Sequence, residues 1–449
     1  MGVRIAGGQG FYGDTPRSIA GLLDEGIDYL CLEALAELTL AILQKDRQKD
    51  EARGYTRDLP AYLQAALPAV ATGRTKVITN AGGINPAAAT RAAVETARGL
   101  GLSGITIATV LGDDLTARLD ELAGQTPLAN LESGAPFSAF APPVLFASAY
   151  LGAKPIVDAL AQGADVVITG RVADAALFLA PLVHEHGWSW DDWDRLASGT
   201  LVGHLLECSG QSAGGNLSVD WATVPRPWDL PYPIAEVEEG GTATITKPAS
   251  SGGRVSFDTV RHQLLYEVHD PAAYLTPDVV ADIADAEVHA VGADRVALRG
   301  VRGHARPAHY KVNVCHEGGW LAEGEISYAG ARAEARARLA AEVLRRRLEG
   351  LVLRVDLIGA VSIWGDDAGR TLAATPDAGL RDVRLRVAAT HDDRAHAERV
   401  AREVMALYTC GPAGGGGVRT ALTPRLNTIS CLLPRESVPV RHERIEEAA

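Results

Sequence analysis

The chain has 449 residues, of which 47% are hydrophobic and 22% are charged, and its formal net charge is −13. This length exceeds the roughly 250 to 300 residues at which a single hydrophobic core stops growing, so we expect two domains. The composition is that of a globular protein and excludes a disordered chain or a coiled coil. Because the chain is acidic and shows no local basic patch, we expect no binding to nucleic acid or to an acidic membrane surface.

Cysteine usage and the N-terminus indicate the compartment. The five cysteines are scattered and form no CxxC pair, a pattern typical of reduced thiols in a cytoplasm. The first residues lack the apolar core of a signal peptide. The apolar stretch 137–151 is interrupted by Pro142 and Pro143 and is shorter than the roughly 20 residues that cross a bilayer. We therefore expect a cytoplasmic protein without a membrane partner, and a homo-oligomer on general grounds.

The first half of the chain alternates short apolar runs with Ala-rich segments of helical periodicity. This alternation predicts βα units around a mainly parallel, doubly wound sheet, which is an α/β fold. Residues 1–224 should form this domain. Its expected strands cover residues 3–6, 28–32, 76–79, 104–110 and 165–169, and its expected helices cover residues 15–25, 59–71, 86–100 and 155–162.

The second half begins with four prolines between residues 225 and 233, which mark a domain boundary or an extended arm. We expect residues 225–295 to be this boundary and a mixed connecting segment. Residues 296–449 then show a β-β-α-β-β-α-β rhythm, which predicts an α+β domain of split-βαβ type. The expected strands lie at 309–314, 323–328, 351–360, 383–389 and 428–433, and the expected helices at 331–348 and 393–407.

Ligands of open parallel sheets bind at the carboxyl ends of the strands, so the loops after the expected strands are the first candidates for a site. The loop after the first strand contains Gln9, Gly10 and Asp14, and its glycines would let backbone amides approach a substrate anion. It does not reproduce GxGxxG, and Glu33 is not convincingly placed as a ribose acid, so a nucleotide cofactor is disfavoured. The loop is either a substrate cradle or merely a tight turn.

The loop after the third expected strand carries Asn80, Gly82, Gly83 and Asn85. The Asn80 side chain and the amides of Gly82 and Gly83 are suited to orienting a carbonyl or carboxylate. Asn85 either contacts the ligand as well or simply caps the helix that begins at Pro86. We favour a substrate-binding role for Asn80.

Cations are scarce in this acidic chain, so those near the expected site are candidates for binding an anion. Arg171, after the strand at 165–169, could clamp a carboxylate or phosphate; the alternative is a structural ion pair with Asp174. Lys247 is a second candidate. Arg419 is a third, beside the Gly-rich loop 411–417, which we expect to be a flexible lid or an anion-binding loop rather than a disordered linker.

The densest polar cluster is at residues 203–216. On a helix, His204, Glu207, Cys208 and Gln211 stand at i, i+3, i+4 and i+7 and share one face, and Asn216 follows. His204 or Glu207 is suited to proton transfer, and Cys208 to nucleophilic attack, although a buried cysteine is usually inert. A metal at this pair would need further ligands such as Asp14 or Asp174, and we predict none.

Segments 7–14, 79–86, 169–174 and 203–216 resemble the acyclic terpene utilisation AtuA family, and the resemblance spans most of the chain. It implies a small-molecule substrate in the catabolism of branched acyclic acids such as citronellate and geranylate, handled as CoA thioesters. Coenzyme A would then be part of the substrate, and any other cofactor is unknown. The resemblance assigns no catalytic residue.

We therefore expect an enzyme that acts on an acyl-CoA or a branched carboxylic acid by proton transfer next to a carbonyl, in the manner of a hydratase or lyase. In this hypothesis Asn80 and nearby amides hold the carbonyl and Arg171 clamps an anion. His204 or Glu207, with Asp174 nearby, moves the proton. The alternatives are a non-catalytic ligand-binding or scaffold subunit and an ester or lactone hydrolase that uses Cys208.

Overall fold

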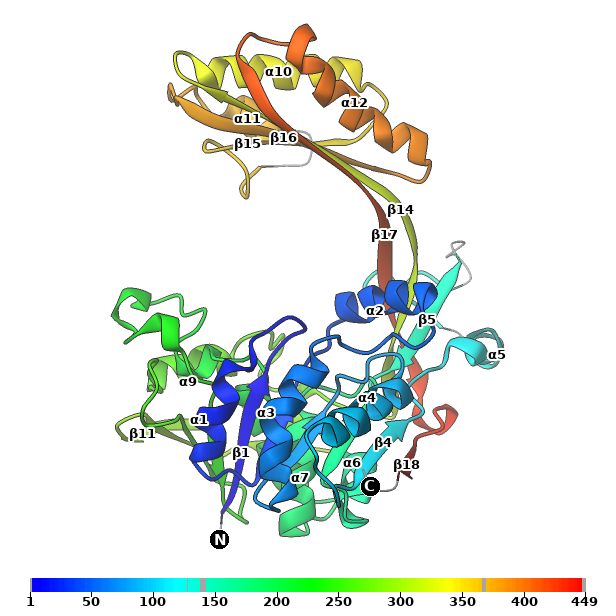
Figure 1. Ribbon diagram of the computed structural model, residues 1–449, viewed down its shortest axis with the longest axis vertical. Coiled ribbons are helices and arrows are strands. Elements are labelled where there is room, and N and C mark those ends of the chain that lie inside the picture. The colour runs from blue at the N-terminus through cyan, green and yellow to red at the C-terminus, as the bar shows by residue number, and fades with distance from the viewer. Residues whose placement is uncertain (1, 127, 138–142, 366–368, 446–449) are drawn as a thin grey trace. The chain divides into compact units, whose positions relative to one another are not determined.

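The computed structural model describes residues 2–126, 128–137, 143–365 and 369–445, and these residues form two compact units (Figure 1). Unit 1 comprises Met1–Ala141, Leu145–Cys315 and Thr428–Ala449, and unit 2 comprises Pro142–Val144 and His316–Asn427. Among the described residues, no helix has both the length and the apolar character needed to span a bilayer.

Unit 1 is built on a sheet that has ten strands within the described residues, in the order β11-β12-β8-β7-β1-β2-β3-β6-β4-β18. The central part of the sheet is parallel, which confirms the predicted α/β class. The parallel strands are β1 (Val3–Gln9), β2 (Tyr29–Leu32), β3 (Lys76–Thr79), β6 (Val166–Thr169) and β4 (Ile107–Leu111).

Helices cover both faces of this parallel region (Figure 1). Leu30 and Leu32 pack on one face with α1 (Ile19–Asp24), α3 (Leu59–Ala71) and α4 (Pro86–Gly99). Tyr29 and Cys31 point to the other face, which is covered by α6 (Lys154–Ala161), α7 (Ala176–His186) and α8 (Trp193–Leu206). Because both faces are buried, the strands are apolar throughout rather than alternating.

Antiparallel strands extend both edges of the sheet. They are β7 (Ile234–Val237), β8 (Ala243–Thr246), β12 (Arg295–Arg299) and β11 (Glu287–Gly292) beyond β1, and β18 (Arg441–Ile445) beyond β4. The unit boundary therefore differs from the expected one. Residues 225–295 belong to unit 1, because β7 pairs with β1, β8 pairs with β7, and both strands bury their apolar side chains. The chain returns to unit 1 at Thr428.

Several elements of unit 1 were not anticipated from the sequence. The helices are α2 (Glu37–Lys49), α5 (Leu119–Gln125), α7 and α9 (Phe257–Leu264). The strands are β5 (Val144–Ala149), β9 (Tyr274–Leu275), β10 (Val280–Asp282) and β13 (Arg302–His304). The expected strand at 104–110 begins only at Ile107, after Gly104 has turned the chain with a φ of +73°.

Unit 2 has the strand order β15-β16-β14-β17 within the described residues. The chain order β14-α10-β15-β16-α12-β17 confirms the predicted split-βαβ arrangement. The long elements are β14 (His309–Ala329), α10 (Ala333–Arg347), β15 (Leu353–Ile358), β16 (Asp382–His391), α12 (Arg394–Cys410) and β17 (Gly415–Pro434), and α11 (Arg370–Ala374) is short. The two expected strands at 309–314 and 323–328 are one continuous strand, β14.

The Gly-rich segment 411–417 joins α12 to β17. Gly411 ends α12, and β17 starts at Gly415, in the middle of the glycines. A Cβ atom on Gly415 would lie 2.7 Å from Ile326 Cδ1, so close packing of β17 on the sheet requires glycine there. The segment is thus partly strand, which differs from the expected lid.

Candidate functional site

Polar side chains gather where β2, β3 and β6 end, as expected for a parallel sheet. Asn80 Nδ2 donates to Glu33 Oε1 at 2.9 Å, and Arg171 Nη1 lies 4.0 Å from the same oxygen. Asn80 Oδ1 also accepts the N–H of Ala34 at 2.7 Å. Asn80 is fully buried with both ends of its amide occupied, so it positions Glu33; contact with a substrate carbonyl would require these bonds to break.

Arg171 forms an ion pair with Asp174, which was the predicted alternative to binding a substrate anion. Its Nη1 lies 3.0 Å from Asp174 Oδ1 and donates to the Leu35 carbonyl oxygen at 2.6 Å. The guanidinium carbon lies 4.0 Å from the centre of the Tyr150 ring. The Arg171 side chain is only 3% exposed whereas that of Asp174 is 36% exposed, so solvent reaches this group through Asp174.

Tyr150 connects Arg171 to a second charged pair. Its hydroxyl donates to Glu37 Oε1, and Lys311 Nζ lies 3.0 Å from the same oxygen. Burial by itself would raise the pKa of Glu37, but the Tyr150 hydrogen bond and the Lys311 charge lower that pKa to about 2. Glu37 is therefore ionised at neutral pH.

His204 and Glu207 lie at the end of α8, where His204 Nδ1 is 3.1 Å from Glu207 Oε1. Gly203 allows this placement, because a Cβ atom there would lie 2.7 Å from Ala175 Cα at the start of α7. Both side chains are buried, 2% and 8% exposed. Among the described residues, His204 Nε2 and Glu207 Oε2 have no hydrogen-bond partner. Buried polar atoms without partners are rare and call for an explanation such as ligand binding.

Burial sets the protonation of these groups. It raises the pKa of Glu207 and of Glu33 well above their usual range, and the charge of Asp174 raises both further while Arg171 opposes. Burial also lowers the pKa of His204. A neutral imidazole beside a carboxyl of raised pKa is an arrangement found at proton-transfer sites.

The shared helical face predicted for this segment is wrong beyond Glu207. Helix α8 ends at Leu206, Ser209 has a φ of +50°, and Gln211 begins a separate 3₁₀ turn. Cys208 and Gln211 therefore do not continue the His204 face. Burial, and then the Glu207 charge, raise the pKa of the Cys208 thiol, which disfavours the thiolate that a cysteine nucleophile needs.

The loop after β1 packs against the segment that follows α8. Gln9 Nε2 donates to Asp58 Oδ2 at 3.1 Å, and the Gly10 N–H donates to Asp14 Oδ2 at 3.1 Å. Asp14 also accepts hydrogen bonds from the Ser209 and Tyr232 hydroxyls. These contacts occupy the groups expected to form a substrate cradle and favour the tight-turn alternative.

The glycines after β3 serve close packing. A Cβ atom on Gly82 would lie 2.4 Å from the Thr169 carbonyl oxygen, and one on Gly83 would lie 2.4 Å from a Leu43 methyl group. Asn85 caps α4, since its side-chain oxygen accepts the Ala88 N–H at 3.3 Å. The cap alternative for Asn85 is thus observed, although the residue also lines a pocket described below.

Within the described parts of the chain, the remaining predicted residues form no hydrogen bond or ion pair with His204, Glu207 or Arg171. Lys247, at the end of β8, is buried and lies 3.4 Å from Asp294 Oδ2. Asn216 is exposed and donates to Gln211 Oε1 at 3.1 Å. Arg419 is an exposed residue of unit 2, whereas all the other candidates belong to unit 1.

A pocket of about 1010 Å³ in unit 1 reaches the neighbourhood of Arg171 through Asp113. Asp113 lines the pocket, and its Oδ2 accepts the Arg171 N–H at 2.8 Å and the Ser148 hydroxyl at 3.2 Å. Burial raises the pKa of Asp113 to about 6. The pocket wall also carries Arg47 from α2 and Arg91 from α4, but neither His204 nor Glu207.

Glu33 and Asp113 were not predicted as site residues from the sequence, although both lie just beyond the ends of strands. Glu33 comes after β2 and was weighed only as a ribose acid, and Asp113 comes two residues after β4. Their positions at the carboxyl edge of the sheet were a sufficient signal. Tyr150 and Lys311 join the site by tertiary packing, because they come from segments far along the chain, and no local pattern marks them.

Unit 1 is thus of the α/β class and carries buried titratable side chains at the carboxyl edge of its parallel strands, the edge at which ligands of such sheets bind. The chain matches the model of the family described as acyclic terpene utilisation family protein AtuA over residues 3–444, and it belongs to this family. The family implies a role in acyclic terpene utilisation, which is compatible with a catabolic enzyme. No curated protein matches the chain.

Proposed function

We propose that the chain is an enzyme that moves a proton next to the carbonyl of a branched acyclic acid or of its CoA thioester, as a hydratase or lyase does. One observation carries the proposal. His204 Nε2 and Glu207 Oε2 are buried without a partner among the described residues, beside the solvent-accessible Asp174. Burial raises the pKa of Glu207 and lowers that of His204, which favours a protonated carboxyl beside a neutral imidazole.

The hydrogen bond between His204 Nδ1 and Glu207 Oε1 suggests how the two groups divide the work. If Nδ1 carries the imidazole hydrogen, Nε2 offers a lone pair and acts as the base. The raised pKa of Glu207 leaves a proton for its other oxygen, which acts as the acid. Asp174 and Arg171 then set the local charge rather than clamp the substrate.

The anionic end of a long substrate would occupy the pocket next to Asp113. Arg47 and Arg91 line this pocket, and their positive charges favour an anion. Helix α2 carries Glu37, which is hydrogen-bonded to Tyr150, and Arg47, which lines the pocket. These two residues of α2 are about 15 Å apart along the helix axis. An elongated molecule such as a CoA thioester fits this separation.

The test compares His204→Asn and Glu207→Gln with wild type, using the CoA thioesters of citronellate and geranylate as substrates and mass spectrometry to detect products. Each variant should lower kcat by about 10² to 10⁴ because it removes one proton-transfer group. Cys208→Ala is the matched neighbour and should keep near-normal turnover, since its thiol takes no part.

Other outcomes would favour the alternatives. A large loss in Cys208→Ala with normal turnover in the other two variants would support the hydrolase. Ligand-dependent thermal stabilisation of the wild type without any product would support a binding or scaffold subunit. Unchanged turnover in folded His204→Asn and Glu207→Gln would exclude the proton-transfer assignment.

A further inference from the structure

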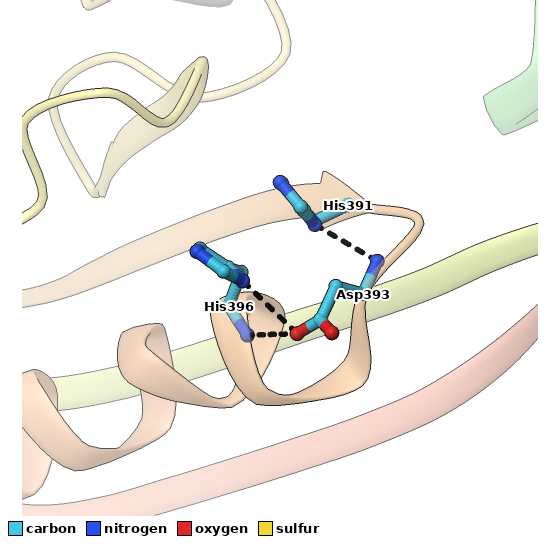
Figure 2. Close-up of side chains that lie close together, drawn as sticks. All are labelled: His391, Asp393 and His396. Carbon is cyan, nitrogen blue, oxygen red and sulfur yellow. Dashed lines mark hydrogen bonds and ion pairs between the residues drawn. The ribbon is translucent and has the colours of Figure 1, made fainter.

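A turn in unit 2 brings together two imidazoles and a carboxylate that the proposed function does not use (Figure 2). Strand β16 ends at His391, and Asp393 is the N-cap of α12, whose first turn contains His396. One ligand atom from each of these residues lies within 4.8 Å of the other two. In the described part of the chain, this is the one group of three such residues that could hold a metal ion.

The turn places one imidazole beside the carboxylate. Asp393 Oδ1 accepts the His396 backbone N–H at 2.9 Å and lies 3.0 Å from His396 Nδ1. Nδ1 and Oδ1 are thus close enough for one metal ion to bind both, which requires the imidazole hydrogen to lie on Nε2.

The second imidazole is adjacent. The rings of His391 and His396 are stacked with centroids 4.7 Å apart and planes inclined by 17° (Figure 2). His391 Nδ1 now accepts the Asp393 N–H at 2.9 Å. A metal would require this ring to turn and release that N–H, which water can satisfy because Asp393 is exposed.

A helix cap alone does not explain the turn. Asp393 is sufficient to cap α12, and stacked imidazoles on an exposed turn add nothing that the cap requires. Two imidazole nitrogens and one carboxylate oxygen, with the remaining position open to water, form a ligand set that suits Zn²⁺ and related transition metals rather than Mg²⁺ or Ca²⁺.

We propose that His391, Asp393 and His396 bind a divalent transition-metal ion. The three residues lie wholly within unit 2, whereas His204 and Glu207 belong to unit 1.

The experiment is titration calorimetry of the full chain, without an affinity tag and after chelator treatment, with Zn²⁺ and separately with Mg²⁺. Because the exposed thiol of Cys410 is a competing ligand, all proteins carry Cys410→Ser. We expect one Zn²⁺ per chain and no Mg²⁺. His391→Ala and His396→Ala should each weaken Zn²⁺ binding at least about tenfold, as loss even of a residue that only supports a ligand usually does.

His289→Ala is the matched control, because His289 is also exposed and also pairs with a carboxylate, Glu287, at 3.2 Å. It should bind Zn²⁺ as the wild type does. Asp393→Asn, which retains a capping side chain, should weaken binding while circular dichroism shows the helices intact. Absence of Zn²⁺ binding, equal affinity in His289→Ala and the two His→Ala variants, or equal binding of Mg²⁺ would overturn the proposal.

Discussion

The same pair of residue types, a histidine and a carboxylate three positions apart, occurs in both units with opposite properties. His204 Nδ1 and Glu207 Oε1 are 3.1 Å apart in unit 1, and His396 Nδ1 and Asp393 Oδ1 are 3.0 Å apart in unit 2. The first pair is 2% and 8% exposed, and the second 58% and 56%. The pKa is raised for Glu207 and lowered for Asp393.

Burial explains the difference. Around Glu207, loss of water disfavours the charged carboxylate more than the positive charge of Arg171 favours it. Around Asp393, water remains, and the hydrogen bonds from His396 decide the direction. Spacing in the sequence therefore brings the two groups together, but the surroundings decide whether the pair suits proton transfer or metal binding.

Arg171→Met should produce the largest change in stability, because it leaves the buried Glu33 and the neighbouring Asp174 without their cation. We expect the free energy of unfolding to fall by about 3 to 5 kcal/mol, as when one partner of a buried ion pair is removed. Urea denaturation measures this. Arg346→Met is the matched exposed case, since Arg346 is 81% exposed and its partner Glu342 is 47% exposed, and it should lose far less. Equal losses would remove the distinction between buried and exposed pairs.

Asp113→Asn should change the pH dependence of stability. The pKa of Asp113 is about 6 in the folded chain against an ordinary 3.8, so the folded state binds this proton more tightly. The stability it contributes is complete below pH 3.8 and is lost as pH rises through 6. The free energy of unfolding of the wild type, relative to Asp113→Asn, should therefore fall by about 3 kcal/mol between about pH 4 and pH 7.

Urea denaturation of both proteins across this pH range is the measurement. A flat difference would show that Asp113 is not held in its protonated form by burial. Asp393 should behave in the opposite way, because its pKa is lowered and its contribution is lost as pH falls.

Asp393→Ala should have the smallest effect. It removes the side chain that caps α12, and the loss of a solvent-exposed cap should lower the free energy of unfolding less than either change above. Faster amide hydrogen exchange in the first turn of α12 is the expected signature. Asp393→Asn should change exchange little, since asparagine caps equally well; if both variants behave like the wild type, the cap is unimportant.

The fold was largely predictable, because its signals are local. The expected helix at 59–71 coincides with α3, and the strand at 76–79 coincides with β3, since apolar runs and helical periodicity are read over a few residues. The split-βαβ order of unit 2 was readable for the same reason. The boundary was not, because β7 and β18 join the sheet of unit 1 through pairing with β1 and β4, which are distant in sequence.

The site was predicted only in part. The rule that ligands bind at the carboxyl edge of a parallel sheet singled out Arg171 and Asp174, and the polar spacing at the end of α8 singled out His204 and Glu207. The same rule also proposed Asn80 and Asp14, whose hydrogen-bonding groups are taken by neighbours such as Glu33 and Ser209. A sequence shows which groups are available but not which are already paired.

The sequence by itself therefore determined the class of fold, the family and the edge of the sheet where polar groups gather, because composition, periodicity and motif order are properties of the chain alone. Only the tertiary structure decided the state of each group. Segments far along the chain bury the His204–Glu207 pair, whereas the Asp393–His396 pair stays exposed to solvent. Desolvation depends on everything packed around a side chain, and that is fixed only when the chain has folded.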